Sequence, residues 1–337
     1  MRIGVMGVHY GHIGGMFRSA LEAENGELVG IVEADDKLYQ QYTAEVAIPR
    51  YHSLDEMLAE ARPELVLEGL VHPDKTELVE ACARAGVHLL MDKPLCRSMD
   101  DWQRMRRAVA QNPIEISMWF TSRSYPPFIA LRRAILDGEL GEIVSLISTH
   151  PHKLTRAGGT PWYFDSSVYT GTFHDVACHG VDQVRWLTGA ECSGVHSLQT
   201  CKRFTDEPQL VDHVQASFQL SNGSLATLTA DWLTPQQSPS FGDTRFILMG
   251  TEGSAHLRAY AGDHLLVVSN KRGGAYEPEL PADRGAGFVA AMIDAIERGE
   301  ELFIPTRDVL AVAQACLVAQ ESAERGGEFL SIPALEF

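Results

Sequence analysis

The sequence has no C-x-x-C pair, although it contains six cysteines, at positions 82, 96, 178, 192, 201 and 316. Scattered cysteines favour reduced thiols in a cytoplasmic protein over a disulfide framework or a zinc site. Basic residues are also few, because 28 Lys and Arg stand against 45 Asp and Glu, for a formal net charge of −17. We therefore expect neither a nucleic-acid partner nor binding to an anionic membrane surface.

The sequence also lacks a long apolar segment, a basic and apolar leader, internal repeats and low-complexity tracts. No apolar stretch reaches the roughly 18 residues that a membrane span requires. With 337 residues, of which 45% are hydrophobic, the chain is long for one core and suits two packed domains. We expect a globular, cytoplasmic protein of two domains.

Residues 1–120 alternate short apolar runs with amphipathic segments. This alternation predicts a parallel sheet covered by helices, an α/β domain of the Rossmann type. The predicted strands are 3–7, 27–33, 64–71, 87–94 and 114–120, and the predicted helices are 13–24, 36–46, 75–86 and 99–111.

Residues 121–337 have a different pattern, in which strand-like runs follow one another. The dipeptide Asn222-Gly223 between two alternating runs is a strong hairpin signal. Helices are predicted near 172–188, 287–298 and 306–325. This half is predicted to be an α+β domain with a large open, mainly antiparallel sheet, and its uncovered face is expected to form a homodimer or homotetramer.

The segment RIGVMGVHYGHIGGMF, residues 2–17, places Gly7, Gly11 and Gly14 between a strand and a helix. Glycines at such a turn let the backbone approach a pyrophosphate, which the helix N-terminus attracts. Glu33 ends the next strand, where a carboxylate can accept ribose hydroxyls and disfavour a 2′-phosphate. The pattern predicts NAD binding, with NADP less favoured; the alternative is a tight turn beside a surface carboxylate.

The glycine loop is longer than G-x-G-x-x-G, so His9 and Tyr10 must bulge near the phosphate site, where they could cap the cofactor or obstruct it. In MDKPL, Lys93 follows the fourth predicted strand at the carboxyl edge of the sheet, where open α/β sheets bind ligands. Its ammonium could stabilise negative charge on a substrate oxygen. The alternative is an ordinary surface lysine.

The segment GTFHDVACHGVDQVRWLTG contains Asp175 and His179, four residues apart. On a helix these side chains face the same direction, so they can reach one substrate. A carboxylate and an imidazole in this arrangement can bind a hydroxyl and transfer its proton.

Together these motifs resemble the Gfo/Idh/MocA family of sugar and cyclitol dehydrogenases over nearly the whole chain. The resemblance rests on the glycine loop, MDKP, DGELGEIVS, Asp175-x-x-x-His179 with Asp182, and GTEGSAHL. It implies NAD(P)-dependent chemistry at a carbinol carbon, with Lys93, Asp175 and His179 as the catalytic set. The implied cofactor-binding residues are Gly7, Gly11, His12, Ile13, Gly14, Glu33, His72 and Lys93.

The sequence departs from the family pattern at several positions. The glycine loop is longer, Asp92 replaces a usual Glu, and Lys75 stands where a histidine is common. Tyr169-Thr170-Gly171 stands where family members often have three glycines, so bulkier groups crowd the substrate side. These departures leave the substrate open.

His150 and His152 lie on one face of a predicted strand, and with His174, Asp175 and His179 they could form a zinc site. Hydride transfer needs no metal, so we expect none and assign these histidines to substrate binding instead. PWYFDSSVY, residues 161–169, could stack on a carbohydrate or simply pack in a loop. The candidate substrate contacts are Arg123, His150, His152, Trp162, Tyr169 and His174.

The sequence thus predicts an NAD-dependent oxidoreductase that transfers a hydride between a nicotinamide and a carbinol or ketone carbon of a sugar, inositol or related polyol. Two alternatives remain. One is a non-catalytic regulator of the same fold that binds a nucleotide or sugar. The other is a redox-neutral hydrolase or lyase that uses tightly bound NAD.

Overall fold

A computed structural model describes residues 1–71, 75–155, 161–207, 210–282 and 287–335. The chain divides into two compact units. The first unit contains Met1–Phe120 together with the later segment that includes helix α8 and ends at Leu310. The second unit contains residues 121–282 and 311–335, so helix α9 starts in one unit and ends in the other.

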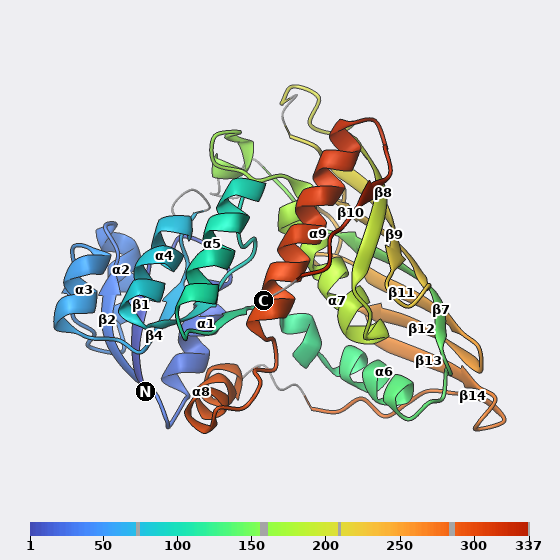
Figure 1. The fold of residues 1–337 in the computed structure, drawn as a ribbon, viewed down its shortest axis with the longest axis horizontal. Helices are drawn as coiled ribbons and strands as arrows, with labels where there is room; N and C mark the ends of the chain where they lie inside the picture. The colour runs from blue at the N-terminus through green and yellow to red at the C-terminus, as the bar shows by residue number, and fades with distance from the viewer. Residues whose placement is uncertain (72–74, 156–160, 208–209, 283–286, 336–337) are drawn as a thin grey trace. The chain divides into compact units, whose positions relative to one another are not determined.

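The first unit contains a parallel sheet, whose described strands run in the order β3-β2-β1-β4-β5-β6. Strands are added first on one side of β1 and then on the other, so right-handed crossovers place helices on both faces. This is the predicted α/β Rossmann topology (Figure 1). The strands are β1 (Arg2–Met6), β2 (Glu27–Val32), β3 (Arg50–Tyr51), β4 (Leu65–Glu68), β5 (His88–Met91) and β6 (Ile116–Met118).

Three helices of the first unit begin at polar side-chain caps. The side chains of Asp35, Ser53 and Ser98 accept hydrogen bonds from the first turns of α2, α3 and α5, which satisfies backbone donors that have no partner inside the helix. The helices are α1 (Ile13–Leu21), α2 (Asp36–Thr43), α3 (Leu54–Glu60), α4 (Lys75–Ala85), α5 (Met99–Gln111) and α8 (Phe288–Arg298).

Helix α8 and the residues to Leu310 lie with the first unit, whereas we expected them in the second domain. The Val289 N–H donates to Ser19 Oγ (3.1 Å), and Asn25 Nδ2 donates to the Ala290 carbonyl (3.0 Å), which fixes α8 beside α1. Such contacts join residues about 270 positions apart in the chain, so no local pattern could predict them. Strand β3 and helix α3 were also not predicted, because both are short.

The second unit contains a larger sheet, with the described strand order β14-β13-β12-β11-β7-β10-β9-β8-β15. All neighbouring pairs are antiparallel except β7 and β10, which run parallel. The sheet is therefore mainly antiparallel, as predicted. Its strands are β7 (Ile143–Pro151), β8 (Cys192–Thr200), β9 (His213–Leu220), β10 (Leu225–Asp231), β11 (Thr244–Gly250), β12 (Gly253–Ala259), β13 (His264–Ser269), β14 (Gly274–Tyr276) and β15 (Leu330–Ser331).

Helices cover one face of this sheet (Figure 1). The strands alternate buried and exposed residues, so the covered face forms the core of the unit. The helical segments are η2 (Thr121–Ser124), α6 (Pro126–Leu136), η4 (Pro161–Phe164), η5 (Phe173–Ala177), α7 (Cys178–Thr188) and α9 (Thr306–Glu324).

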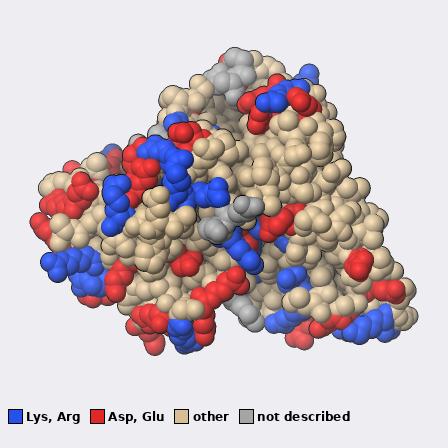
Figure 2. Space-filling view, in the orientation of Figure 1, with Lys and Arg blue, Asp and Glu red and all other residues tan. Residues whose placement is uncertain are grey.

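Acidic and basic side chains are interspersed on the face of the molecule that Figure 2 shows. Several blue side chains adjoin one another on the left-hand part of that face, with red ones beside them, although Asp and Glu outnumber Lys and Arg in the chain. Within the part of the chain that the structure describes, no helix is both long and apolar enough to cross a membrane.

Candidate functional sites of the two units

The glycine loop leaves β1 through a tight turn at Gly7, whose φ is +70°. A Cβ at Gly69 would lie 2.7 Å from the Gly7 carbonyl oxygen, so both positions need glycine for the two segments to approach. A Cβ at Gly11, by contrast, would meet nothing within 4 Å. The space beside the Gly11 backbone is therefore open. A pyrophosphate can approach the backbone of the loop there, as it does in dinucleotide-binding folds.

The two extra residues of the loop point in different directions. Both the His9 and Tyr10 N–H groups donate to the Gly69 carbonyl, each at 3.0 Å, which fixes the bulge. The Tyr10 side chain is buried, and its ring lies 5.1 Å from Lys93 Nζ, a cation–π distance. The His9 ring turns outward instead, where Nε2 lies 3.0 Å from Glu33 Oε1. Tyr10 therefore belongs to the core beneath the loop.

Glu33 lies one residue past β2, at the carboxyl edge of the sheet, as predicted for a ribose-binding acid. Its Oε2 accepts the Val8 N–H (3.0 Å), and its Oε1 accepts the Asp35 N–H (2.8 Å) as well as contacting His9. Arg50 donates to the carbonyls of Glu33 (2.7 Å) and Ala34 (2.8 Å). No sequence pattern indicated this arginine, because it comes from the short strand β3.

Helix α1 begins directly after the loop, at Ile13, with His12 as its N-cap residue. His12 Nδ1 lies 2.9 Å from Asp92 Oδ1, which connects the loop to the end of β5. A Cβ at Gly14 would contact only Tyr42 Oη at 3.4 Å, whereas one at Gly15 would lie 3.1 Å from the Trp119 ring. Gly15 thus serves helix packing, and Gly14 faces the more open side. His72, also assigned to cofactor binding, lies outside the described residues.

Lys93 lies two residues after β5, and its side chain is buried. The Lys93 N–H donates to Asp92 Oδ1 (2.8 Å), and the Lys93–Pro94 peptide bond is cis. The second oxygen, Asp92 Oδ2, is buried without a hydrogen-bond partner among the described residues, so it can accept a hydrogen bond from a ligand. Asp92, which stands where the family commonly has Glu, therefore orients the backbone of Lys93.

Lys75 is fully buried and uses all three ammonium donors around the same segment. Its Nζ donates to the carbonyls of Asp92 (2.7 Å) and Pro94 (3.1 Å) and forms an ion pair with Glu68 Oε2 (3.0 Å). Glu68 also accepts the Asp92 N–H (3.1 Å). Burial raises the pKa of Glu68 to about 7, an effect that the Lys75 ammonium opposes. This ion pair holds the backbone on both sides of Lys93.

In the second unit, Asp175 belongs to a π-helical turn, η5, rather than to the regular helix that the sequence predicted. His179 lies on α7, which starts at Cys178. The turn is buried, and its Asp175 N–H donates to the Gly171 carbonyl (3.0 Å). Single π-turns in helices are frequent at functional sites. His179 is partly buried, unlike the residues on either side of it.

His150 and His152 come from the end of β7 and approach the same helix. His152 stacks on His179 with ring centroids 6.3 Å apart and planes 12° from parallel. His150 is buried, and its Nε2 lies 3.1 Å from Ser148 Oγ. A Cβ at Gly180 would lie 2.6 Å from that nitrogen, so only glycine lets α7 pack this closely on His150. Burial lowers the pKa of His150 to about 3 and that of His174 to about 4, so both rings are neutral near pH 7.

An aromatic cluster lies beside these histidines. Trp232 Nε1 donates to Tyr169 Oη (2.8 Å), and the Trp232 ring also contacts His152. Tyr163 stacks on Trp162, with centroids 3.9 Å apart, and meets Trp232 edge-on. Burial, together with the negative charge of Asp175, raises the pKa of Tyr169 well above its usual range. These side chains offer flat surfaces and hydroxyl groups of the kind that bind carbohydrates.

Arg123 forms a two-point ion pair with Asp182, through Nε to Oδ2 at 3.0 Å and Nη2 to Oδ1 at 2.6 Å. Both side chains are almost fully buried. We predicted Arg123 as a substrate contact, and in the structure its guanidinium binds Asp182 of α7. Asp182, which the sequence grouped with Asp175 and His179, therefore serves to join η2 to α7.

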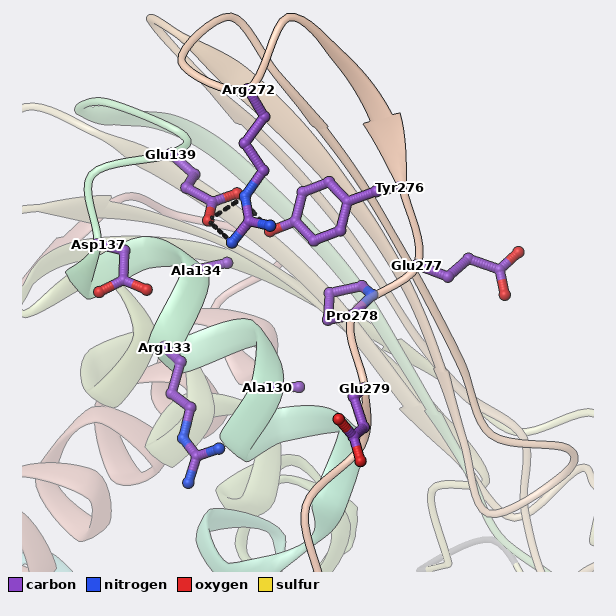
Figure 3. Close-up of a pocket in the computed structure, with 10 residues that line it drawn as sticks. All are labelled: Ala130, Arg133, Ala134, Asp137, Glu139, Arg272, Tyr276, Glu277, Pro278 and Glu279. Atoms are coloured by element: carbon purple, nitrogen blue, oxygen red, sulfur yellow. Dashed lines mark hydrogen bonds and ion pairs between the residues drawn. The ribbon is translucent and has the colours of Figure 1, made fainter.

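A separate cavity of about 280 Å³ lies between α6 and the β13–β14 hairpin (Figure 3). In it, Glu139 accepts hydrogen bonds from Arg272 Nε (2.8 Å) and Tyr276 Oη. Burial alone would raise the pKa of Glu139, but these two donors hold it below its usual value. The acid is thus already satisfied, and the cluster fastens the hairpin to α6 rather than forming a catalytic site.

Sequence reasoning missed several residues of both sites. Glu68, Gly69 and Arg50 support the first site, and Trp232 and Gly180 shape the second. Gly69 lies inside the predicted strand 64–71, so none of these residues carried a local signal of its role. Within the described ranges no three His, Cys, Asp or Glu side chains are grouped closely enough to hold a metal ion.

Comparisons with known proteins agree with this arrangement. Residues 1–118 match an oxidoreductase family described by its NAD-binding Rossmann fold, and residues 128–256 match the Gfo/Idh/MocA C-terminal domain. Among solved structures, levoglucosan dehydrogenase in complex with NADH superposes with a TM-score of 0.84 at 20% identity, covering 99% of this chain and 100% of that one. At this identity the likeness concerns the fold.

Curated relatives are similar in sequence. Myo-inositol dehydrogenase of Streptomyces leeuwenhoekii is 29% identical over 75% of each chain. Scyllo-inositol 2-dehydrogenase (NADP(+)) of Bacillus subtilis is 25% identical over 60% of this chain, which corresponds to 56% of that enzyme's length. The matched part thus spans from about half to three quarters of these relatives. The two family matches together cover both units, and the chain belongs to the Gfo/Idh/MocA family of NAD-binding oxidoreductases.

Proposed function

We propose that this protein is an NAD-dependent dehydrogenase that acts on a CH–OH group of a sugar, inositol or related polyol. The observation that carries the proposal is the position of Lys93, which a buried network holds at the carboxyl edge of the Rossmann sheet. An ammonium fixed at this edge suits charge stabilisation on a substrate oxygen. The inositol dehydrogenases named above support the substrate class.

The glycine loop would hold the dinucleotide, through Gly7, Gly11, His12, Ile13 and Gly14, and Glu33 lies at the edge of the sheet where the adenosine ribose would bind. When bound, the dinucleotide supplies a nicotinamide that accepts or returns a hydride. NAD is favoured over NADP in this proposal, because the Glu33 carboxylate disfavours a 2′-phosphate. Relatives named for NADP exist, so the preference is a property of this chain to be measured.

Three side chains would act on the substrate. In the oxidative direction His179 removes the hydroxyl proton, and Lys93 stabilises the developing alkoxide. Asp175 would orient the substrate by accepting a hydrogen bond from one of its hydroxyls. His150, His152, Trp162, Tyr169 and His174 would form the surrounding substrate surface. Of these residues, His150 and His174 are buried, and their lowered pKa values keep both rings neutral near pH 7, so they add no charge to this surface.

A homodimer or homotetramer is part of the proposal. The uncovered face of the large sheet presents neighbouring apolar side chains, and Ile147 and Ile247 lie opposite each other across β7 and β11. Val144 is 54% exposed and Leu225 is 56% exposed on the same sheet. A patch of this kind is stabilised when a second copy covers it. Sedimentation should give at least twice the chain mass, and Ile147→Asp should shift the protein towards monomer.

Enzymatic screening tests the proposed activity. Sugars, inositols and their keto forms are each mixed with the protein and either NAD or NADP, and the absorbance of the reduced nicotinamide is followed. We expect turnover with at least one polyol and NAD. Binding without turnover across the whole panel would indicate a regulator instead. Substrate conversion with no net absorbance change and retained nucleotide would indicate redox-neutral chemistry.

A further inference from the structure

The acid expected to bind the adenosine ribose is not accessible. The Glu33 side chain is 1% exposed, whereas the His9 side chain that contacts it is 44% exposed. Glu33 Oε1 already accepts the Asp35 N–H and contacts His9 Nε2, and Oε2 accepts the Val8 N–H. A ligand that approaches this edge of the sheet therefore meets the imidazole before the carboxylate.

We propose that His9 is the residue that contacts the adenosine ribose and that it lowers the discrimination between NAD and NADP. This inference rests on the proposed dinucleotide binding. His9 Nε2 lies 3.0 Å from Glu33 Oε1 while the side chain stays 44% exposed, so the imidazole can offer its other ring nitrogen to a ribose hydroxyl or to a phosphate. His9, one of the two inserted loop residues, thus allows the site to accept both the ribose of NAD and the 2′-phosphorylated ribose of NADP.

The charges around His9 support this role. Without the imidazole, a 2′-phosphate would meet the carboxylates of Glu33 and Asp35, which repel it. With the imidazole in place, Glu33 is covered and paired at 3.0 Å. Arg50 adds a positive charge nearby, but its guanidinium is already bound to two carbonyls and to Asp36 Oδ1 (2.6 Å). His9 is therefore the side chain whose removal most directly exposes the acid.

Calorimetric titration of NAD and of NADP into the wild-type protein and His9→Ala tests the inference. Charge-assisted hydrogen bonds contribute enough that the ratio Kd(NADP)/Kd(NAD) should rise by about tenfold or more in His9→Ala. NAD affinity should change by less than about threefold, because a ribose hydroxyl can then donate to Glu33 itself. His52→Ala, which removes an exposed histidine from the same unit, should leave both constants unchanged.

A second variant keeps the test independent of loop folding. Glu33→Gln removes the charge, so the ratio should fall in that variant, and His9→Ala should have a smaller effect in the Glu33→Gln background than alone. If the ratio Kd(NADP)/Kd(NAD) of His9→Ala stays within about twofold of the wild-type ratio, or falls below it, the inference is overturned. The proposed binding of NAD is untouched by that result. A wild-type protein that binds neither nucleotide overturns both this inference and the proposed function.

Discussion

At the scale of single residues, buried charges decide the geometry around Lys93. Glu68 and Lys75 pair within the core, and their remaining hydrogen bonds go to the backbone at Asp92 and Pro94. Such a pair contributes little net stability by itself, but removing one partner leaves the other charge buried and unpaired. The pair therefore makes the position of Lys93 dependent on residues that touch no substrate.

Lys75→Met should be strongly destabilising, by about 3–5 kcal/mol, because it leaves Glu68 unpaired and two carbonyls without a donor. Thermal unfolding of Lys75→Met measures this loss, and Lys37→Met on the exposed face of α2 is the control. The double variant with Glu68→Gln should lose less than the sum of the single variants. An unchanged Tm in Lys75→Met would show that the ion pair does not hold this segment.

The buried histidine His174 should make the protein sensitive to acid. Its pKa is lowered to about 4 in the fold, against 6.5 as the ordinary value, so the unfolded chain binds more protons between these pH values. Its contribution to stability is complete above about pH 6.5 and is lost as the pH falls towards 4, with a slope of up to ~1.4 kcal/mol per pH unit.

Urea unfolding across that pH range should therefore give a flatter pH dependence for His174→Gln than for wild type. His264→Gln, on an exposed part of β13, should keep the wild-type slope. Equal slopes in wild type and His174→Gln would mean that the ring is protonated in the folded protein as easily as in the unfolded chain.

At the scale of elements, the close packing of α7 on β7 depends on one glycine. Alanine normally stabilises a helix interior relative to glycine by about 1 kcal/mol. At Gly180, however, the new methyl group would lie 2.6 Å from His150 Nε2, and the buried ring on a central strand has little room to move.

Gly180→Ala should thus be destabilising by about 1–3 kcal/mol in chemical unfolding, despite its better helix propensity. Gly274→Ala is the matched control, because a Cβ there meets nothing within 4 Å. Combining Gly180→Ala with His150→Ala should recover part of the loss. A stabilised Gly180→Ala variant would contradict the packing seen here.

Local patterns predicted the elements that are long and periodic, such as α5, α7 and the hairpin at Asn222-Gly223. The same patterns could not predict the π-turn at Asp175 or the short strand β3, because neither has a periodicity of its own. The sequence placed Lys93 and Glu33 at the carboxyl ends of predicted strands, and the structure has both residues just past the ends of β5 and β2. Their partners, Lys75 and His9, could be found only from tertiary contacts.

At the scale of the whole molecule, the chain combines a nucleotide-binding unit with a sheet unit, and each carries part of the proposed chemistry. The first unit provides Lys93 and the glycine loop, and the second provides Asp175, His179 and the aromatic surface. Our central proposal is that Lys93 of the first unit and His179 of the second both take part in turnover. A change at His179 should therefore affect turnover without affecting the nucleotide site.

The most direct measurement is kcat for His179→Ala on the substrate found by screening, together with its Kd for NAD. Proton transfer by a positioned group typically contributes about 10²–10⁴-fold, so kcat should fall by that order while the Kd for NAD stays within about threefold. Lys93→Ala should lose at least as much, Asp175→Asn should affect both kcat and KM, and His264→Ala should match wild type. Near-normal turnover by His179→Ala would contradict the account.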